Sequence, residues 1–202
     1  MKTVLNNKKP LRIILTGGGT AGPVVPILAV AKELHEKRPD AQFLFIGTSN
    51  GPEKELTEKA GIHFAPISAG KLRRYWSILN ILTPFQILVG FFQARGILKR
   101  LMPDVIIGAG GFVQVPVMWA GWLLGIPVVI HQQDIVPSLS NKLCAPIASV
   151  ITTAFESSVQ EFSSGSGLPI TKNTAMVHWT GNPSALSLPL PKKSSALEHF
   201  GF

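Results

Sequence analysis

Four glycines fall within residues 17–22, in the stretch LTGGGTAGPVVP that follows an apolar run. Glycine tolerates positive φ and lets the backbone approach a ligand closely. Where such a turn leads into a helix, free N–H groups and the helix dipole favour a bound anion. The stretch therefore predicts a phosphate or diphosphate site, with a tight structural turn as the alternative, although it fits neither the dinucleotide-binding nor the Walker A pattern. The candidate contacts are Gly18, Gly19, Thr20, Ala21 and Gly22.

A second glycine turn occurs in IIGAGGFVQVP, again between an apolar run and a helical pattern, and a third polar segment ends a later apolar run. In open parallel sheets, ligands bind beyond the carboxyl ends of the strands, so we expect the three segments to meet at one cleft. A histidine after a strand is also compatible with a purely structural role. The second turn contributes Gly108, Gly110, Gly111 and Phe112, and the third segment contributes His131, Gln132, Gln133 and Asp134.

Short apolar runs surround these segments and are expected to be strands. Several are continuous rather than alternating, which is typical of strands that are covered on both faces in a parallel sheet. Helical patterns lie between them, and this alternation predicts a doubly wound, Rossmann-like α/β domain with right-handed crossovers. The runs are residues 11–16, 42–47, 62–67, 105–108, 127–131, 150–153 and 175–179.

Three segments between these runs have clear helical features. The stretch GPEKELTEKAG has Pro52 near its start and Gly61 at its stop, with its charges expected along an exposed face. Residues 117–124 form a further helical pattern, closed by the sequence GIP. An apolar stripe after the first glycine turn consists of Ile27, Val30, Ala31 and Leu34.

The composition narrows the class of protein. The 202 residues are 46% hydrophobic and 15% charged, which indicates a globular chain rather than a disordered one. The net charge of +8 favours an anionic partner, such as nucleic acid, a phosphorylated substrate or acidic lipid, or marks only a basic surface. The single cysteine, Cys144, excludes an internal disulfide, fits a reducing compartment and is expected to pack in the core. No cluster at metal-ligand spacing is visible.

Residues 71–100 combine an apolar centre with basic ends. Such a surface suits docking on an anionic membrane, where each basic residue contributes about 1 kcal/mol; the alternative is a helix buried against the sheet, and part of the segment must be that. Residues 75–94 are uncharged over nearly the length of a bilayer span, but they contain polar residues, proline and glycine, so we do not expect a span. The residues predicted to dock are Arg73, Arg74, Trp76, Ile78, Leu79, Leu82 and Phe85.

The two ends of the chain differ in composition from the rest. Residues 1–10 have no signal-peptide core and are expected to be a disordered lead-in to a domain at 11–180. Residues 181–202 are rich in Pro, Ser and Leu and are expected to be a linker with one short helix at 195–200. No further strand follows, so we expect one domain of a larger protein or one half of a split protein.

Over about residues 11–183, the sequence resembles the N-terminal half of the proteins of the MurG family, in glycosyltransferase family 28. The stretches that carry the resemblance are GGTAGPVVPILAVAKEL, GAGGFVQVPVMWAGWLLGIPVVIHQQD, SNKLCAPIA and GNP. That family transfers N-acetylglucosamine from UDP-GlcNAc to undecaprenyl-pyrophosphoryl-MurNAc-pentapeptide. The resemblance implies one half of a GT-B fold, which binds the acceptor's diphosphate at the glycine turns and docks on the cytoplasmic face of the cell membrane. It also implies a C-terminal donor-binding domain in cis or in trans, no cofactor beyond the substrate UDP-GlcNAc, and donor-side contacts at Thr20, Ala21, Gly22 and Asp134.

Three motifs depart from the family's usual sequence. The usual GGTGGH reads GGTAGP, so Pro23 replaces a histidine, and the usual GNPVR reads GNPSA, so Ala185 replaces an arginine. The usual HEQN reads HQQD, so Gln132 replaces one carboxylate while Asp134 supplies another. Phosphate binding by backbone would survive these changes, and Asp134 is the remaining carboxylate expected near the cleft, which makes it the candidate general base.

Two other functions compete with this interpretation. The missing histidine and arginine favour a non-catalytic module, derived from such an enzyme, that binds a lipid diphosphate or a nucleotide. The net charge alone would suit a nucleic-acid binder, but the interleaved aromatic and basic residues of single-strand binders are absent, so we expect no nucleic-acid partner.

Overall fold

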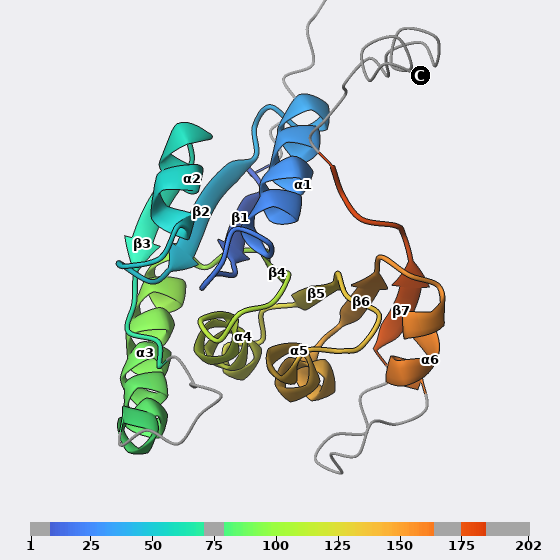
Figure 1. The fold of residues 1–202 in the computed structure, drawn as a ribbon. Coiled ribbons are helices and arrows are strands. Elements are labelled where there is room, and N and C mark those ends of the chain that lie inside the picture. The colour runs from blue at the N-terminus through green and yellow to red at the C-terminus, as the bar shows by residue number, and fades with distance from the viewer. Residues whose placement is uncertain (1–8, 71–78, 164–174, 185–202) are drawn as a thin grey trace, which may run out of the picture.

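The computed structural model describes residues 9–70, 79–163 and 175–184 of the chain. These residues form one parallel sheet of seven strands in the order β3-β2-β1-β4-β5-β6-β7 (Figure 1). The order reverses between β1 and β4, so the ends of these two strands flank the switch point at which doubly wound sheets bind ligands. The strands are β1 (Arg12–Thr16), β2 (Gln42–Gly47), β3 (His63–Pro66), β4 (Val105–Gly108), β5 (Val128–Gln132), β6 (Val150–Thr153) and β7 (Met176–Trp179).

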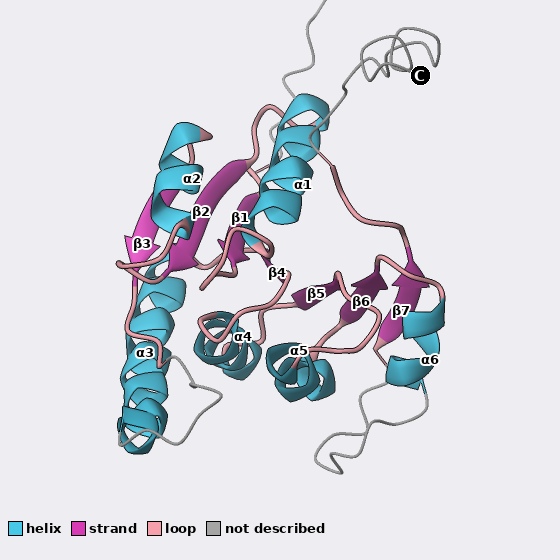
Figure 2. Cartoon of the chain, in the orientation of Figure 1, coloured by secondary structure: helices cyan, strands magenta, loops and turns pink. Residues whose placement is uncertain are grey.

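Helices cover both faces of the sheet (Figure 2). One face carries α1 (Val24–Lys37) and α2 (Glu53–Lys59), and the other carries α3 (Leu79–Leu101), α4 (Gln114–Leu123) and α5 (Leu139–Cys144). A short 3-10 turn (Ala145–Ile147) follows α5, and α6 (Ser157–Ser163) packs against β7.

The side chains of β1 alternate between two hydrophobic clusters, one under each helical layer. Ile13 and Leu15 pack with Ile27 of α1, whereas Ile14 packs with Met118 of α4. This burial on both faces explains why the strands appear in the sequence as continuous apolar runs. The predicted fold class, a doubly wound parallel α/β domain, is confirmed.

The predicted strands are confirmed, with ends that differ by at most one residue. The helix predicted at 117–124 begins earlier, at Gln114, because Pro116 fits in the first turn, where its missing N–H is not needed. The sequence did not predict α5 and α6, each under two turns long. The helix expected at 195–200 and most of the lead-in lie outside the described residues.

Cys144 is fully buried at the end of α5, and burial raises the pKa of its thiol. The expectation that this cysteine packs in the core is confirmed.

Candidate functional site

The two glycine turns lie side by side at the switch point. The first follows β1 and the second follows β4, and these strands are hydrogen-bonded neighbours. A Cβ atom at Gly111 would collide with the backbone oxygen of Gly18, and a Cβ at Gly17 would lie 3.3 Å from the backbone oxygen of Gly110. The turns therefore touch through main-chain atoms. Gly111 is required by this contact and by its φ of 88°.

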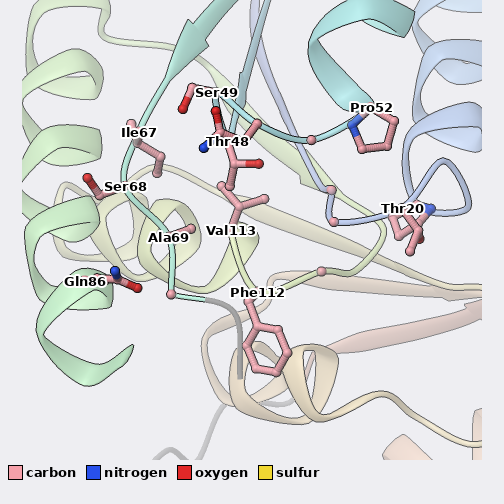
Figure 3. Close-up of a pocket in the computed structure, with 17 residues that line it drawn as sticks. Thr20, Thr48, Ser49, Pro52, Ile67, Ser68, Ala69, Gln86, Phe112 and Val113 are labelled. Atoms are coloured by element: carbon pink, nitrogen blue, oxygen red, sulfur yellow. The ribbon is translucent and has the colours of Figure 1, made fainter. Parts of the chain in front are cut away.

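A cavity of about 1110 Å³ opens beside the turns (Figure 3). Its walls come from both glycine turns, from the segments that follow β2 and β3, and from Gln86 of α3. Five of the predicted contacts line it: Gly18, Gly19, Thr20, Gly111 and Phe112. The other predicted residues stand outside this lining: Ala21, Gly22, Gly108, Gly110, His131, Gln132, Gln133 and Asp134.

A buried carboxylate, that of Glu53, lies behind the first turn. Glu53 begins α2 and is 0% exposed, so the expectation that the charges of this helix lie along an exposed face is wrong for this residue. Its Oε1 accepts the N–H of Thr48 at 2.9 Å and contacts the Thr48 hydroxyl, and its Oε2 accepts the N–H of Gly19 at 3.4 Å. Both oxygens accept backbone N–H groups, as an ionised carboxylate does. Room for the carboxylate comes from the missing side chains of Gly18, Gly47 and Gly51.

The start of α1, next to the first turn, offers few backbone donors. Pro23 precedes the helix and Pro26 lies in its first turn, and neither has an N–H group. The N–H groups of Val24 and Val25 both donate to the backbone oxygen of Ala21, at 3.1 Å. Donors for an anion at this position must therefore come from the turn itself. The sequence pattern had instead predicted that the helix start contributes them.

An uncharged amide, that of Gln114, lies behind the second turn. Gln114 is fully buried, and its Oε1 accepts the N–H of Gly110 at 2.7 Å. Its Nε2 donates to Oδ1 of Asn141 at 2.5 Å, and Nδ2 of Asn141 donates to Oε1 of Gln132 at 2.6 Å. Nε2 of Gln132 then donates to the backbone oxygen of Asp134 at 2.7 Å. A chain of side-chain amides thus connects the second turn with the loop after β5.

The third polar segment therefore serves partly as a support. Gln132, predicted to face the cleft, is buried within the amide chain. Nε2 of Gln133 donates to the backbone oxygen of Ala109 at 3.0 Å, and this hydrogen bond helps to hold the second turn. Only Asp134 is exposed, just beyond the carboxyl end of β5.

His131 joins three neighbouring segments. Its Nδ1 lies 2.9 Å from the hydroxyl of Thr152 in β6, and its Nε2 lies 3.3 Å from Oδ1 of Asn182, just after β7. Burial lowers the pKa of His131, and the hydrogen bond to Asn182 partly opposes this effect. The imidazole is therefore held neutral and supports the edge of the sheet.

Sequence reasoning missed Glu53, Gln114 and Asn141 as parts of the site. One signal for Glu53 was available, because glycines two residues before it and six residues before it leave room for a carboxyl group. The burial of Gln114 and Asn141 depends on α4 packing beside α5, which no local pattern reveals.

The predicted membrane-docking residues are only partly placed. Arg73, Arg74, Trp76 and Ile78 lie outside the described residues, and Leu79 and Leu82 belong to α3 although their side chains are not described. Phe85 is 66% exposed, and Leu88 and Phe92 are exposed at the next helical positions of the same face. Within the described ranges, no helix has both the length and the hydrophobicity that a bilayer crossing requires.

Comparison with known proteins identifies the family. The sequence profile of the Glycosyltransferase family 28 N-terminal domain matches residues 13–153, which run from β1 to β6 and include both glycine turns. The chain belongs to glycosyltransferase family 28.

Named proteins of two bacteria are similar in sequence. A protein of Clostridium botulinum (strain Langeland / NCTC 10281 / Type F) is named UDP-N-acetylglucosamine--N-acetylmuramyl-(pentapeptide) pyrophosphoryl-undecaprenol N-acetylglucosamine transferase. It is 47% identical over 149 residues, which are 74% of this chain and 42% of the relative. A protein of the same name from Caldanaerobacter subterraneus subsp. tengcongensis is 38% identical over 192 residues, 95% of this chain and 50% of the relative. The chain thus spans half or less of these relatives' length.

Solved structures with a similar fold also match the chain. The crystal structure of Acinetobacter baumannii MurG matches with a TM-score of 0.67 and 29% identity, over 87% of this chain and 46% of that chain. The UDP-GlcNAc 2-epimerase of Neisseria meningitidis matches with a TM-score of 0.62 at 14% identity, over 85% of this chain and 46% of that chain, which shows a shared fold alone.

Proposed function

We propose that this chain is the acceptor-binding half of a transferase that moves N-acetylglucosamine from UDP-GlcNAc to undecaprenyl-pyrophosphoryl-MurNAc-pentapeptide, which converts lipid I to lipid II in peptidoglycan synthesis. The observation that carries the proposal is the pair of glycine turns in main-chain contact beside a large cavity, in a family 28 domain. The relatives are named for this transfer. The donor sugar is bound by a second domain, in cis or in trans.

The chemistry of the turns supports diphosphate binding. Among the described residues, the N–H groups of Gly111, Phe112 and Val113 have no acceptor, and they lie at the start of α4. Backbone donors at a helix start stabilise phosphate charge without rearrangement, and they hold the acceptor in place for attack by its hydroxyl on the anomeric carbon of the donor.

The proposal is tested first by binding. We expect geranyl diphosphate to release heat on titration into the chain, and geraniol, which lacks the diphosphate, to release none. A silent titration with geranyl diphosphate would contradict the proposal.

Transfer requires the completed enzyme. The chain joined to the donor-binding half of the Caldanaerobacter relative should transfer N-acetylglucosamine from UDP-GlcNAc to a lipid I analogue. Binding of the acceptor without transfer would favour the alternative, a non-catalytic lipid-diphosphate or nucleotide module, which the replacement of the family's histidine by Pro23 favours.

Asp134 is the proposed general base, which takes the proton from the acceptor hydroxyl. Its side chain is exposed at the strand end, while its backbone oxygen is held by Gln132 and by the hydroxyl of Ser158 at 3.3 Å. In the completed enzyme, Asp134→Asn should lower kcat by about 100-fold or more, since that is what general-base catalysis contributes. Normal turnover by this variant would remove the assignment.

We also propose that α3 contacts the cytoplasmic face of an anionic membrane. Phe85, Leu88 and Phe92 share one exposed face of α3, and the exposed Arg95 and Lys99 continue that face toward the helix end. Phe85→Ser combined with Phe92→Ser should reduce flotation of the chain with phosphatidylglycerol vesicles. Phe155→Ser, at an exposed position after β6, is the matched control that should float as the wild type does.

A further inference from the structure

The two glycine turns are backed by groups of different charge. The buried carboxylate of Glu53 holds Gly19 in the first turn, and the neutral amide of Gln114 holds Gly110 in the second turn. Among the ion pairs of the described residues, none involves Glu53, so no described cation is paired with its carboxylate. The two turns are alike in sequence, but they therefore differ in the electrostatic potential that they present to an anion.

Glu53 acts on the first turn in two ways. The N–H of Gly19 is directed at Oε2, and an N–H group donates well along one direction only, so this donor is not aimed into the cavity. A phosphate on the first turn would also stand close to a buried negative charge, where the low dielectric strengthens repulsion. The N–H groups of Thr20, Ala21 and Gly22 have no acceptor among the described residues. The first turn therefore has donors for an anion, but its electrostatic potential does not favour one.

We propose that Glu53 is a specificity-determining residue that keeps phosphate off the first glycine turn and directs the acceptor's diphosphate to the second. This inference rests on the proposed function only for the presence of a diphosphate. The first turn then faces an uncharged part of the acceptor.

The test is a titration of the ¹⁵N-labelled chain with inorganic pyrophosphate, followed through individual amide signals. In the wild type, the amides of Gly111 and Phe112 should shift, and those of Gly19 and Thr20 should not. In Glu53→Gln, the first-turn amides should shift as well, with a Kd at that turn at least about tenfold below the lower limit that the unshifted wild-type amides set, which corresponds to about 1.4 kcal/mol.

Two variants control for net charge and for folding. Glu58→Gln removes the same charge from an exposed position of α2 and should behave as the wild type does. Glu53→Asp keeps the carboxylate and should keep phosphate off the first turn. If Glu53→Gln does not fold, the wild-type titration can still overturn the proposal, because first-turn amides that shift together with those of Gly111 and Phe112 would contradict it.

The proposal is overturned if wild-type Gly19 and Thr20 shift over the same pyrophosphate range as Gly111 and Phe112, or if Glu53→Gln behaves as Glu58→Gln does. A wild type without any shift in the second turn would instead count against the proposed function. The comparison of Glu53→Gln with Glu58→Gln would still decide the role of Glu53, so the two failures are distinguishable.

Discussion

The first and second glycine turns follow neighbouring strands, contain similar residues and touch each other, yet they are built differently. The first is exposed from Gly19 onward, adjoins a helix start with few donors, and is held by a charged group from α2. The second is more enclosed and is held by a neutral amide from the helix that it precedes. Similar glycine patterns thus do not imply similar ligands, because the groups behind a turn set its potential.

The largest effect is expected where the turns meet. Gly111→Ala must adopt a φ of 88° and must also displace the backbone of Gly18, which together should cost about 3 kcal/mol or more of unfolding free energy. Gly19→Ala is the matched control, since Gly19 has a φ of 84° but open space around it, and should cost about 1 kcal/mol. Chemical denaturation measures both, and equal losses would show that the contact between the turns does not matter.

The amide behind the second turn can be removed. Gln114→Leu leaves the N–H of Gly110 and the Oδ1 of Asn141 buried without their partner, which should cost about 2 kcal/mol. The same change at the exposed Gln42 should be nearly neutral in the same denaturation experiment. A stable Gln114→Leu chain would contradict the supporting role of the amide chain.

Gln114→Glu would make the second turn resemble the first by placing a carboxylate behind it. We expect pyrophosphate to bind about tenfold more weakly, a difference of about 1.4 kcal/mol, because the new charge opposes the anion. Gln42→Glu, at the opposite end of the sheet, is the control for net charge. If Gln114→Glu bound pyrophosphate with unchanged affinity, the charge behind the second turn would not influence phosphate binding.

The smallest effect concerns acid stability. The pKa of folded His131 is lowered from its ordinary value of 6.5, so the unfolded chain binds the proton more readily and stability should fall as the pH drops below that value. His131→Gln should weaken this dependence, whereas His178→Gln, at an exposed position, should not. Thermal unfolding measured between neutral and mildly acidic pH tests this prediction. If the stability of the wild type and of His131→Gln depended on pH in the same way, the prediction would be wrong.

The sequence predicted the sheet well because strands buried on both faces leave continuous apolar runs. It predicted the two turns for a similar reason, since positive φ and close main-chain contact both select glycine. It did not predict the role of Glu53, because a glutamate after a helix-starting proline is normally exposed. Its burial depends on space left by Gly18, in a distant part of the chain, together with Gly47 and Gly51. The roles of Gln114 and Asn141 likewise depend on contacts between helices that are separate in the sequence.

The contact between Gly18 and Gly111 fixes the spacing of the two loops by atoms that every amino acid possesses. The contact requires only that Gly111 has no side chain, and no rotamer or charge sets that distance. The residues around the turns can therefore change in evolution, and with them the preferred ligand, while the distance between the two turns stays constant.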